Sequence, residues 1–171
     1  RLPQAVIVAA RKTADATAGM GWLSGATSAA LTLEAASLYP IHPTLLPPLV
    51  RFFARYGQHE RSLFGFLLSA EPFGLQDFAE RLASPDTWYG LAEFYDYVRS
   101  AFGHRLSGPS YQTHWLRVAA TVDTAQDLTF LEFRVVKTVA ILNLLDSDDL
   151  LATDRAVLAC LSPALPRDVE A

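Results

Sequence analysis

The sequence predicts an all-α fold, and three observations support this prediction. Apolar residues recur at helical spacing along most of the chain, as in Trp88, Leu91, Tyr95, Val98 and Phe102. No segment shows the regular apolar–polar alternation of a half-buried strand. The 171 residues are 51% hydrophobic and only 19% charged, which supplies enough apolar surface for a core and excludes a disordered chain. We expect roughly seven to nine helices without an internal repeat.

The first part of the chain contains two alanine-rich segments. Residues 4–18 and 27–38 are helical by propensity, because alanine loses little entropy in a helix. Gly19, Gly21 and Gly25 separate them and are typical of a connecting loop. We therefore expect two helices joined by a short turn.

A third helix covers the leucine-rich stripe 45–56. Two adjacent prolines lie in its first turn, where a missing N–H group costs least, and Gly57 ends it. The next helix begins near Gln58 and contains the apolar residues 63–67. This arrangement places one helix directly after another across a glycine.

Three further helices are predicted in the middle of the chain. A short helix covers 75–82 and is closed by Ser84-Pro85. The aromatic helix that contains Trp88 is predicted to begin after Asp86 and to stop at Gly103. Ser110 is then suited to cap a helix that repeats the same apolar pattern.

The last third of the chain predicts a buried helix followed by a short one. Residues 128–145 are apolar nearly all round, which is typical of a central buried helix. The acidic segment 146–149 is suited to a solvated turn. Thr153 then caps a final helix that runs to about Leu161.

Composition excludes several classes of protein. The net charge of −4 and the pI near 5.5 are not those of a basic nucleic-acid-binding module. Cys160 is the single cysteine, so the chain has no intrachain disulfide and no multi-cysteine zinc site, and we expect this thiol to be buried and inert. We expect no membrane segment, because charged residues interrupt 128–145, and no signal peptide.

The common catalytic motifs are absent from the sequence. The pairs Lys12-Thr13 and Lys137-Thr138 lack the glycines of a phosphate-binding loop, and no Gly-x-Ser-x-Gly or Gly-x-Gly-x-x-Gly element occurs. We therefore assign no catalytic residue and no metal ligand. The four histidines lack metal-ligand spacing and are interpreted as structural; they are His42, His59, His104 and His114. Glu93, Asp96 and Arg99 are interpreted as one solvated helix face.

Arg61 is the one candidate for ligand contact. It lies in the first turn of a helix directly after the helix that ends at Gly57. A guanidinium is suited to bidentate phosphate contact, and a helix N-terminus adds positive potential. The alternative is a structural ion pair with Glu60 or Glu71.

Four segments resemble large prokaryotic AAA-type ATP-binding proteins, including the P-loop ATPases of BREX and phage-growth-limitation defence systems. The more specific pair is 39–43, Tyr-Pro-Ile-His-Pro, and 56–67, Tyr-Gly-Gln-His-Glu-Arg-Ser-Leu-Phe-Gly-Phe-Leu. The segments 91–97 and 134–145 look like later blocks of the same proteins. The resemblance extends over roughly 39–161, which is most of the chain.

The resemblance implies a piece of a longer protein that lies C-terminal to its nucleotide-binding core. Residues 1–125 would form a helical lid-like region, and 126–171 would begin a winged-helix-like region that stops before its recognition helix. In this resemblance, Arg61 matches the position of the arginine that is called sensor 2 in AAA-type ATPases, where it contacts the nucleotide phosphate. His59 stands where the family more often has Asn, and it receives no role. The resemblance implies that the parent protein binds ATP and Mg²⁺ and that this piece binds no cofactor.

Two functional hypotheses remain from the sequence. In the first, the chain is an accessory helical region of a cytoplasmic multidomain ATPase, which senses nucleotide through Arg61 and relays lid position to protein partners or DNA. In the second, it is a helical protein–protein interaction scaffold, in which Arg61 is structural. Nothing in the sequence supports a stand-alone enzyme, and we expect no catalytic activity from this chain by itself.

Overall fold

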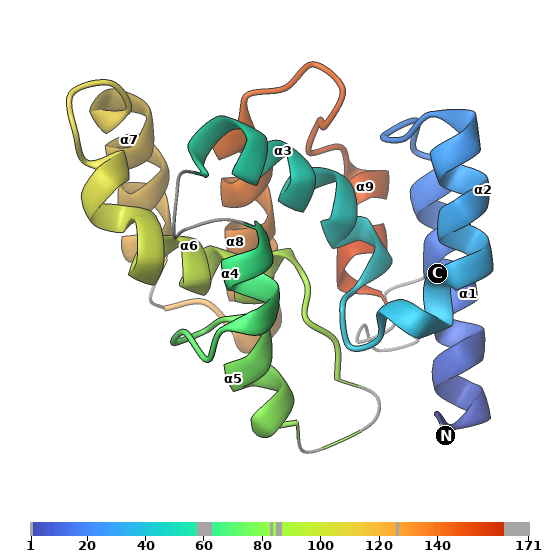
Figure 1. Cartoon of the computed structure of the whole chain (residues 1–171). Coiled ribbons are helices and arrows are strands. Elements are labelled where there is room, and N and C mark those ends of the chain that lie inside the picture. The colour runs from blue at the N-terminus through green and yellow to red at the C-terminus, as the bar shows by residue number, and fades with distance from the viewer. Residues whose placement is uncertain (1, 58–62, 83, 85–86, 126, 163–171) are drawn as a thin grey trace.

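The computed structural model describes every residue except 1, 58–62, 83, 85–86, 126 and 163–171 (Figure 1). The described part is all-α, as the sequence predicted, with nine α-helices, two short 3₁₀ helices and no strand beyond one isolated bridge. The helices are α1 Gln4–Ala18, α2 Gly25–Glu34, α3 Leu46–Tyr56, α4 Leu63–Leu68, α5 Leu75–Glu80, α6 Leu91–Leu106, α7 Gln112–Asp123, α8 Phe130–Leu145 and α9 Asp154–Leu161. The 3₁₀ helices are η1 Ala35–Leu38 and η2 Pro43–Leu45.

The helices are arranged around α8. This helix packs against α6, α7, α3 and α9, whereas α1 and α2 pack against each other at one edge of the molecule. Figure 1 shows α1 and α2 at that edge and α7 at the opposite one. None of the helices over the described residues combines the length and the hydrophobicity that crossing a bilayer requires.

Helix α3 forms as its sequence predicted. Its prolines lie at the first two positions after Leu46, and Arg51 and Arg55 are exposed on the side opposite the core. The N–H of Gly57 donates to the carbonyl of Phe53, 2.9 Å away, and a Cβ atom at Gly57 would clash with that same carbonyl oxygen. The helix therefore ends at a residue that only glycine fits.

The centre of the core is a cluster of aromatic rings. The ring of Phe52 on α3 packs edge-to-face against those of Phe94 and Phe102 on α6, with centroids 5.2 and 4.9 Å apart. Phe66 on α4 packs against Phe94 and Tyr97, at 5.6 and 5.0 Å. All five side chains are fully buried, so the core joins α3, α4 and α6.

The predicted boundaries of the aromatic helix are wrong. Trp88 and Tyr89 precede α6 in an extended segment, where Tyr89 exchanges backbone hydrogen bonds with Pro40 and His42 at 2.8 and 2.9 Å. Those backbone groups cannot also serve a helix, so α6 begins only at Leu91, after Gly90. At its other end α6 continues through Gly103, because Leu106 is buried in the core.

Smaller differences concern neighbouring helix ends. Tyr111, rather than Ser110, is the N-cap of α7, and α5 ends at Glu80. The predicted cap Asp86 and the predicted start Gln58 lie outside the described residues.

Helix α8 is central, but only one part of it is fully buried. Thr129 caps its first turn, with its hydroxyl accepting from the N–H of Glu132 and the Glu132 carboxylate accepting from the N–H of Thr129. Ile141, Leu144 and Leu145 are buried, whereas Phe130 is 80% exposed. The predicted complete burial is thus wrong for the N-terminal half, because the neighbouring helices cover only part of its surface.

One hydrophobic cluster contains residues from both predicted regions of the chain. Phe52 and Phe94 belong to the predicted lid-like region 1–125, and Ile141 and Cys160 belong to the predicted winged-helix-like region 126–171. The described helices on both sides of residue 125 therefore share a core. The winged-helix identity of α8 and α9 stays a prediction.

We expect the aromatic core to dominate the stability of this chain. Replacing the buried ring in Phe52→Ala removes contacts with four other rings and leaves a cavity, which should lower the free energy of unfolding by about 3–5 kcal/mol. Phe64→Ala replaces a side chain that is 72% exposed, so it should change the free energy of unfolding by less than about 0.5 kcal/mol. Urea unfolding followed by circular dichroism measures both, and equal losses would contradict the assignment of the core.

Candidate functional site

A groove between α2 and α3 is the largest apolar depression among the described pockets. It has a volume of about 580 Å³. Its lining residues are apolar except for Thr27, Glu34 and Arg51. We call it the α2–α3 groove. Its volume and lining fall in the range of sites that bind apolar groups.

The α2–α3 groove lies between two hydrophobic clusters of the described residues. Trp22, which is buried, belongs to the main cluster, whereas Leu31 belongs to a smaller cluster formed with α1. Val50 on the α3 wall is 57% exposed, and Leu151, next to the lining residue Leu150, is 58% exposed. Several large apolar side chains thus face solvent in and beside this groove, a feature typical of interaction sites.

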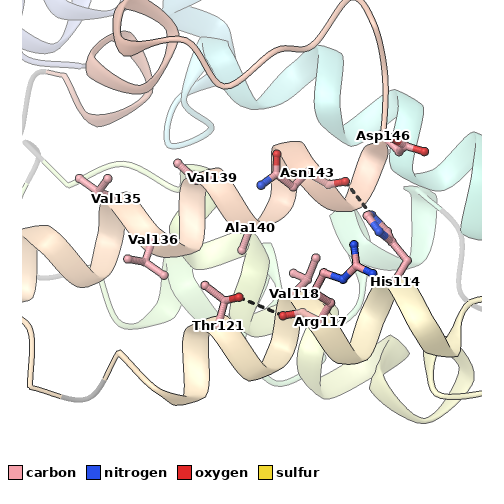
Figure 2. Close-up of a pocket in the computed structure, with 10 residues that line it drawn as sticks. All are labelled: His114, Arg117, Val118, Thr121, Val135, Val136, Val139, Ala140, Asn143 and Asp146. Atoms are coloured by element: carbon pink, nitrogen blue, oxygen red, sulfur yellow. Dashed lines mark hydrogen bonds between the residues drawn. The ribbon is translucent and has the colours of Figure 1, made fainter.

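A second groove runs between α7 and α8 and has a volume of about 450 Å³ (Figure 2). Figure 2 shows that Val135 and Val136 lie toward one end of it and His114 and Asp146 toward the other. Val118 and Ala140 are buried between the two helices, and Arg117 lines the groove from α7. This α7–α8 groove is one part of the α8 surface that the neighbouring described helices leave open.

The C-terminal end of α8 is held by side chains from two other helices. The last carbonyls of a helix lack intrahelical donors, and the helix dipole favours cations there. His114 on α7 donates from Nε2 to the Asn143 carbonyl at 2.8 Å. On α3, the Tyr56 hydroxyl donates to the Leu144 carbonyl at 3.0 Å, and Arg55 Nη1 donates to that of Leu145 at 2.6 Å. These contacts fix the position of α3, which is one wall of the α2–α3 groove, and of α7, which is one wall of the α7–α8 groove.

Ion pairs join α6 to its neighbours, which corrects the prediction of a solvated face. Glu93 receives a bidentate contact from Arg134 on α8, and both side chains are about four-fifths buried. Asp96 pairs with Lys137 at 2.7 Å, and Arg99 pairs with the carboxylate of Asp123 on α7. Helical spacing within α6 could not show that α7 and α8 supply partners for its acidic and basic residues.

The buried histidine His42 is structural, as the sequence predicted. Its Nε2–H donates to the Ser162 carbonyl, and its Nδ1 accepts from the hydroxyl of Thr44 at 2.6 Å. Burial lowers the pKa of His42 to about 4, so the ring is neutral at pH 7. These bonds tie the start of η2 to the end of α9.

Cys160 is buried close to the same polar cluster, as predicted. It is hydrogen-bonded to Thr44, but burial raises the pKa of its thiol to about 12. A thiolate is the reactive form of cysteine, so this thiol is not a poised nucleophile at neutral pH. Among the residues that the structure describes, no group of three His, Cys, Asp or Glu side chains is suited to hold a metal ion.

The candidate phosphate ligand Arg61 lies outside the described residues, as do His59 and Glu60. The elements that flank it are described: α3 ends before Gly57 and α4 begins at Leu63. The predicted alternative partner Glu71 accepts a hydrogen bond from the Tyr97 hydroxyl at 2.6 Å.

Sequence reasoning did not predict either groove. A signal for the α2–α3 groove is nevertheless present, because α2 carries no charged residue before Glu34 and has apolar residues on two faces. Leu31 is buried against α1, whereas Leu33 is 80% exposed. A helix that is apolar on more than one face needs more than one partner surface.

Comparisons of this chain with protein-family models, with curated proteins and with solved structures found no match.

We expect acidification to destabilise the chain through His42. The pKa of this ring is about 4 in the folded state and about 6.5 in the unfolded state, so between these values the unfolded state binds the additional proton. The stability that the neutral, buried His42 ring contributes is complete above pH 6.5. It is lost as the pH falls toward 4, by about 3 kcal/mol in total.

Urea unfolding at several pH values between 4 and 7 measures this loss. His42→Gln removes the titrating ring while other groups still titrate, so the difference between the two pH profiles isolates His42. Parallel profiles would show that His42 takes up no proton on unfolding. Because the variant also loses hydrogen bonds, imidazole NMR of the unmodified protein should independently show a neutral His42 at pH 5.

Proposed function

We propose that this chain is a helical protein-interaction module that binds through the α2–α3 groove. The observation that carries the proposal is this apolar groove of about 580 Å³, which lies between α3, packed into the main hydrophobic cluster, and α2, packed into the smaller one. Val50 remains 57% exposed on its wall. Apolar grooves between helices are suited to a partner helix that inserts apolar side chains at helical spacing.

The chemistry of the described polar groups supports a binding role over catalysis. His42 is neutral and engaged at both ring nitrogens, and the Cys160 thiol is buried and protonated. Glu93 and Asp96, the acidic residues that face α8, are engaged by cations. One described pocket is lined by Ser110, Thr113 and His114, but Nε2 of this histidine already donates to the Asn143 carbonyl instead of facing either hydroxyl as a base.

A photoreactive amino acid placed at position 50 tests this proposal in cells. The side chain at this position faces the groove, so illumination should give a discrete covalent product of defined mass. Position 8 on α1 is the matched control, because Val8 is 56% exposed and does not line the groove. Equal products at both positions, or none at position 50, would contradict the proposal.

A second proposal rests on the sequence segments that resemble AAA-type ATPases, with Tyr-Gly-Gln-His-Glu-Arg at 56–61 as the most specific. We propose that the module is an accessory region of such an ATPase and that Arg61 senses the nucleotide phosphate. The layout of one helix ending before Gly57 and another beginning at Leu63 is compatible with this role. ATP and Mg²⁺ would bind to the core of that parent protein.

Arg61→Ala in the full-length ATPase tests the second proposal. Loss of a charge-assisted hydrogen bond to phosphate should lower ATP turnover about tenfold or more. Arg81→Ala is the matched control, because Arg81 is an exposed arginine that pairs with Asp77 on its own helix. Unchanged turnover in Arg61→Ala would remove the sensing role and leave the interaction module in place.

A further inference from the structure

Helix α2 presents a second apolar face that the other described residues leave open. Its residues from Gly25 to Leu33 carry no charge. Leu31 faces α1 and is buried, whereas Ala26, Ala30 and Leu33 are exposed on the other side. An exposed leucine on an uncharged helix face is typical of a surface that is covered in an assembly.

The same helix forms one wall of the α2–α3 groove. The groove is therefore bordered by a ridge, α2, whose exposed side chains before Glu34 are small except for Leu33. Helices pack by placing the ridge of one into the groove of another. A second α2 is a ridge of suitable width and composition for this groove, because alanines permit close approach of two backbones.

The charges on the two walls are opposite in sign. Glu34 lies on the α2 wall and Arg51 on the α3 wall. In a two-fold dimer every contact between two different residues forms twice with the copies exchanged, so if α2 of one copy lies beside α3 of the other, the reverse contact forms as well. Glu34 of each copy then faces Arg51 of the other. Arg51 pairs with Asp149 at 3.2 Å, but both side chains are about half exposed or more, so Arg51 stays accessible.

We propose that the occupant of the α2–α3 groove is α2 of a second copy of this chain, in a two-fold dimer with two Glu34–Arg51 pairs. This inference rests on the proposed interaction role of the groove and names its partner. The dimer buries Leu33 on the inserted α2 and Val50 on the α3 wall of the groove, which are both large, apolar and exposed.

Analytical ultracentrifugation of the whole chain over a range of concentrations tests the dimer. The unmodified chain should dimerise, and Leu33→Glu should raise the dissociation constant at least tenfold, because it places a carboxylate in the apolar contact. Since Leu33 is 80% exposed in the single chain, this variant should fold normally by circular dichroism. Val8→Glu, at an exposed position of α1 outside the groove, should dimerise like the unmodified chain.

Charge reversal gives a sharper test of the two-fold arrangement. Glu34→Arg and Arg51→Glu should each dimerise at least tenfold more weakly, because each places like charges together twice in the dimer. An equal mixture of the two variants should recover a dimer that contains one copy of each, since both pairs are then of opposite sign. Native mass spectrometry with one variant isotope-labelled distinguishes this mixed dimer from either parent.

A chain that stays monomeric at all concentrations, or a mixture that forms no mixed dimer, would overturn the second-copy proposal. The crosslinking experiment at position 50 distinguishes an incorrect second-copy proposal from an incorrect binding role of the groove. A product at position 50 with twice the mass of the chain supports the dimer. A product of another mass contradicts the dimer but supports the interaction module, and no product beyond that seen at position 8 contradicts both.

Discussion

The carbonyl groups at the end of α8 are the point on which the arrangement of the helices depends. Three consecutive carbonyls, of Asn143, Leu144 and Leu145, accept hydrogen bonds from two other helices. The Asn143 carbonyl also accepts from the N–H of Asp146, but the last carbonyls of a helix have no donors within it, and burying them unpaired would be costly. His114 and Arg55 satisfy two of them, so α7 and α3 are held at fixed positions around α8. The two grooves are the spaces that this arrangement leaves open.

The grooves arise because two helices are more apolar than their neighbours can cover. Helix α8 is covered by α3, α6, α7 and α9, but Val135 and Val139 remain only partly buried. Helix α2 buries Leu31 against α1 and leaves Leu33 exposed. The ion pair of Glu93 with Arg134 adds a polar contact that fixes how α8 lies on α6. Apolar packing alone is less directional, so this pair also limits the alternative positions of α8.

The buried polar groups around His42 join two parts of the fold, η2 and the end of α9. His42, Thr44 and the Ser162 carbonyl form a hydrogen-bonded group in which every ring nitrogen of the histidine is used. Burial keeps both His42 and Cys160 neutral, because charged forms are disfavoured away from water. The binding role that we propose rests on the open apolar surfaces and not on these groups. The resemblance to AAA-type ATPases adds a context in which such a module would operate, with Arg61 as its proposed link to nucleotide.

The sequence by itself determined the all-α class, because helical periodicity and capping residues act over a few neighbouring positions. It determined the start of α3 at its proline pair and the cap of α9 at Thr153 in the same way. Only the tertiary structure decided that Tyr89 pairs with Pro40 instead of entering α6, and that Glu93 meets Arg134. These contacts join residues far apart in the chain, so no local pattern contains them. The tertiary structure also determined the grooves, since a groove depends on which faces of two helices remain uncovered after all the other faces have packed.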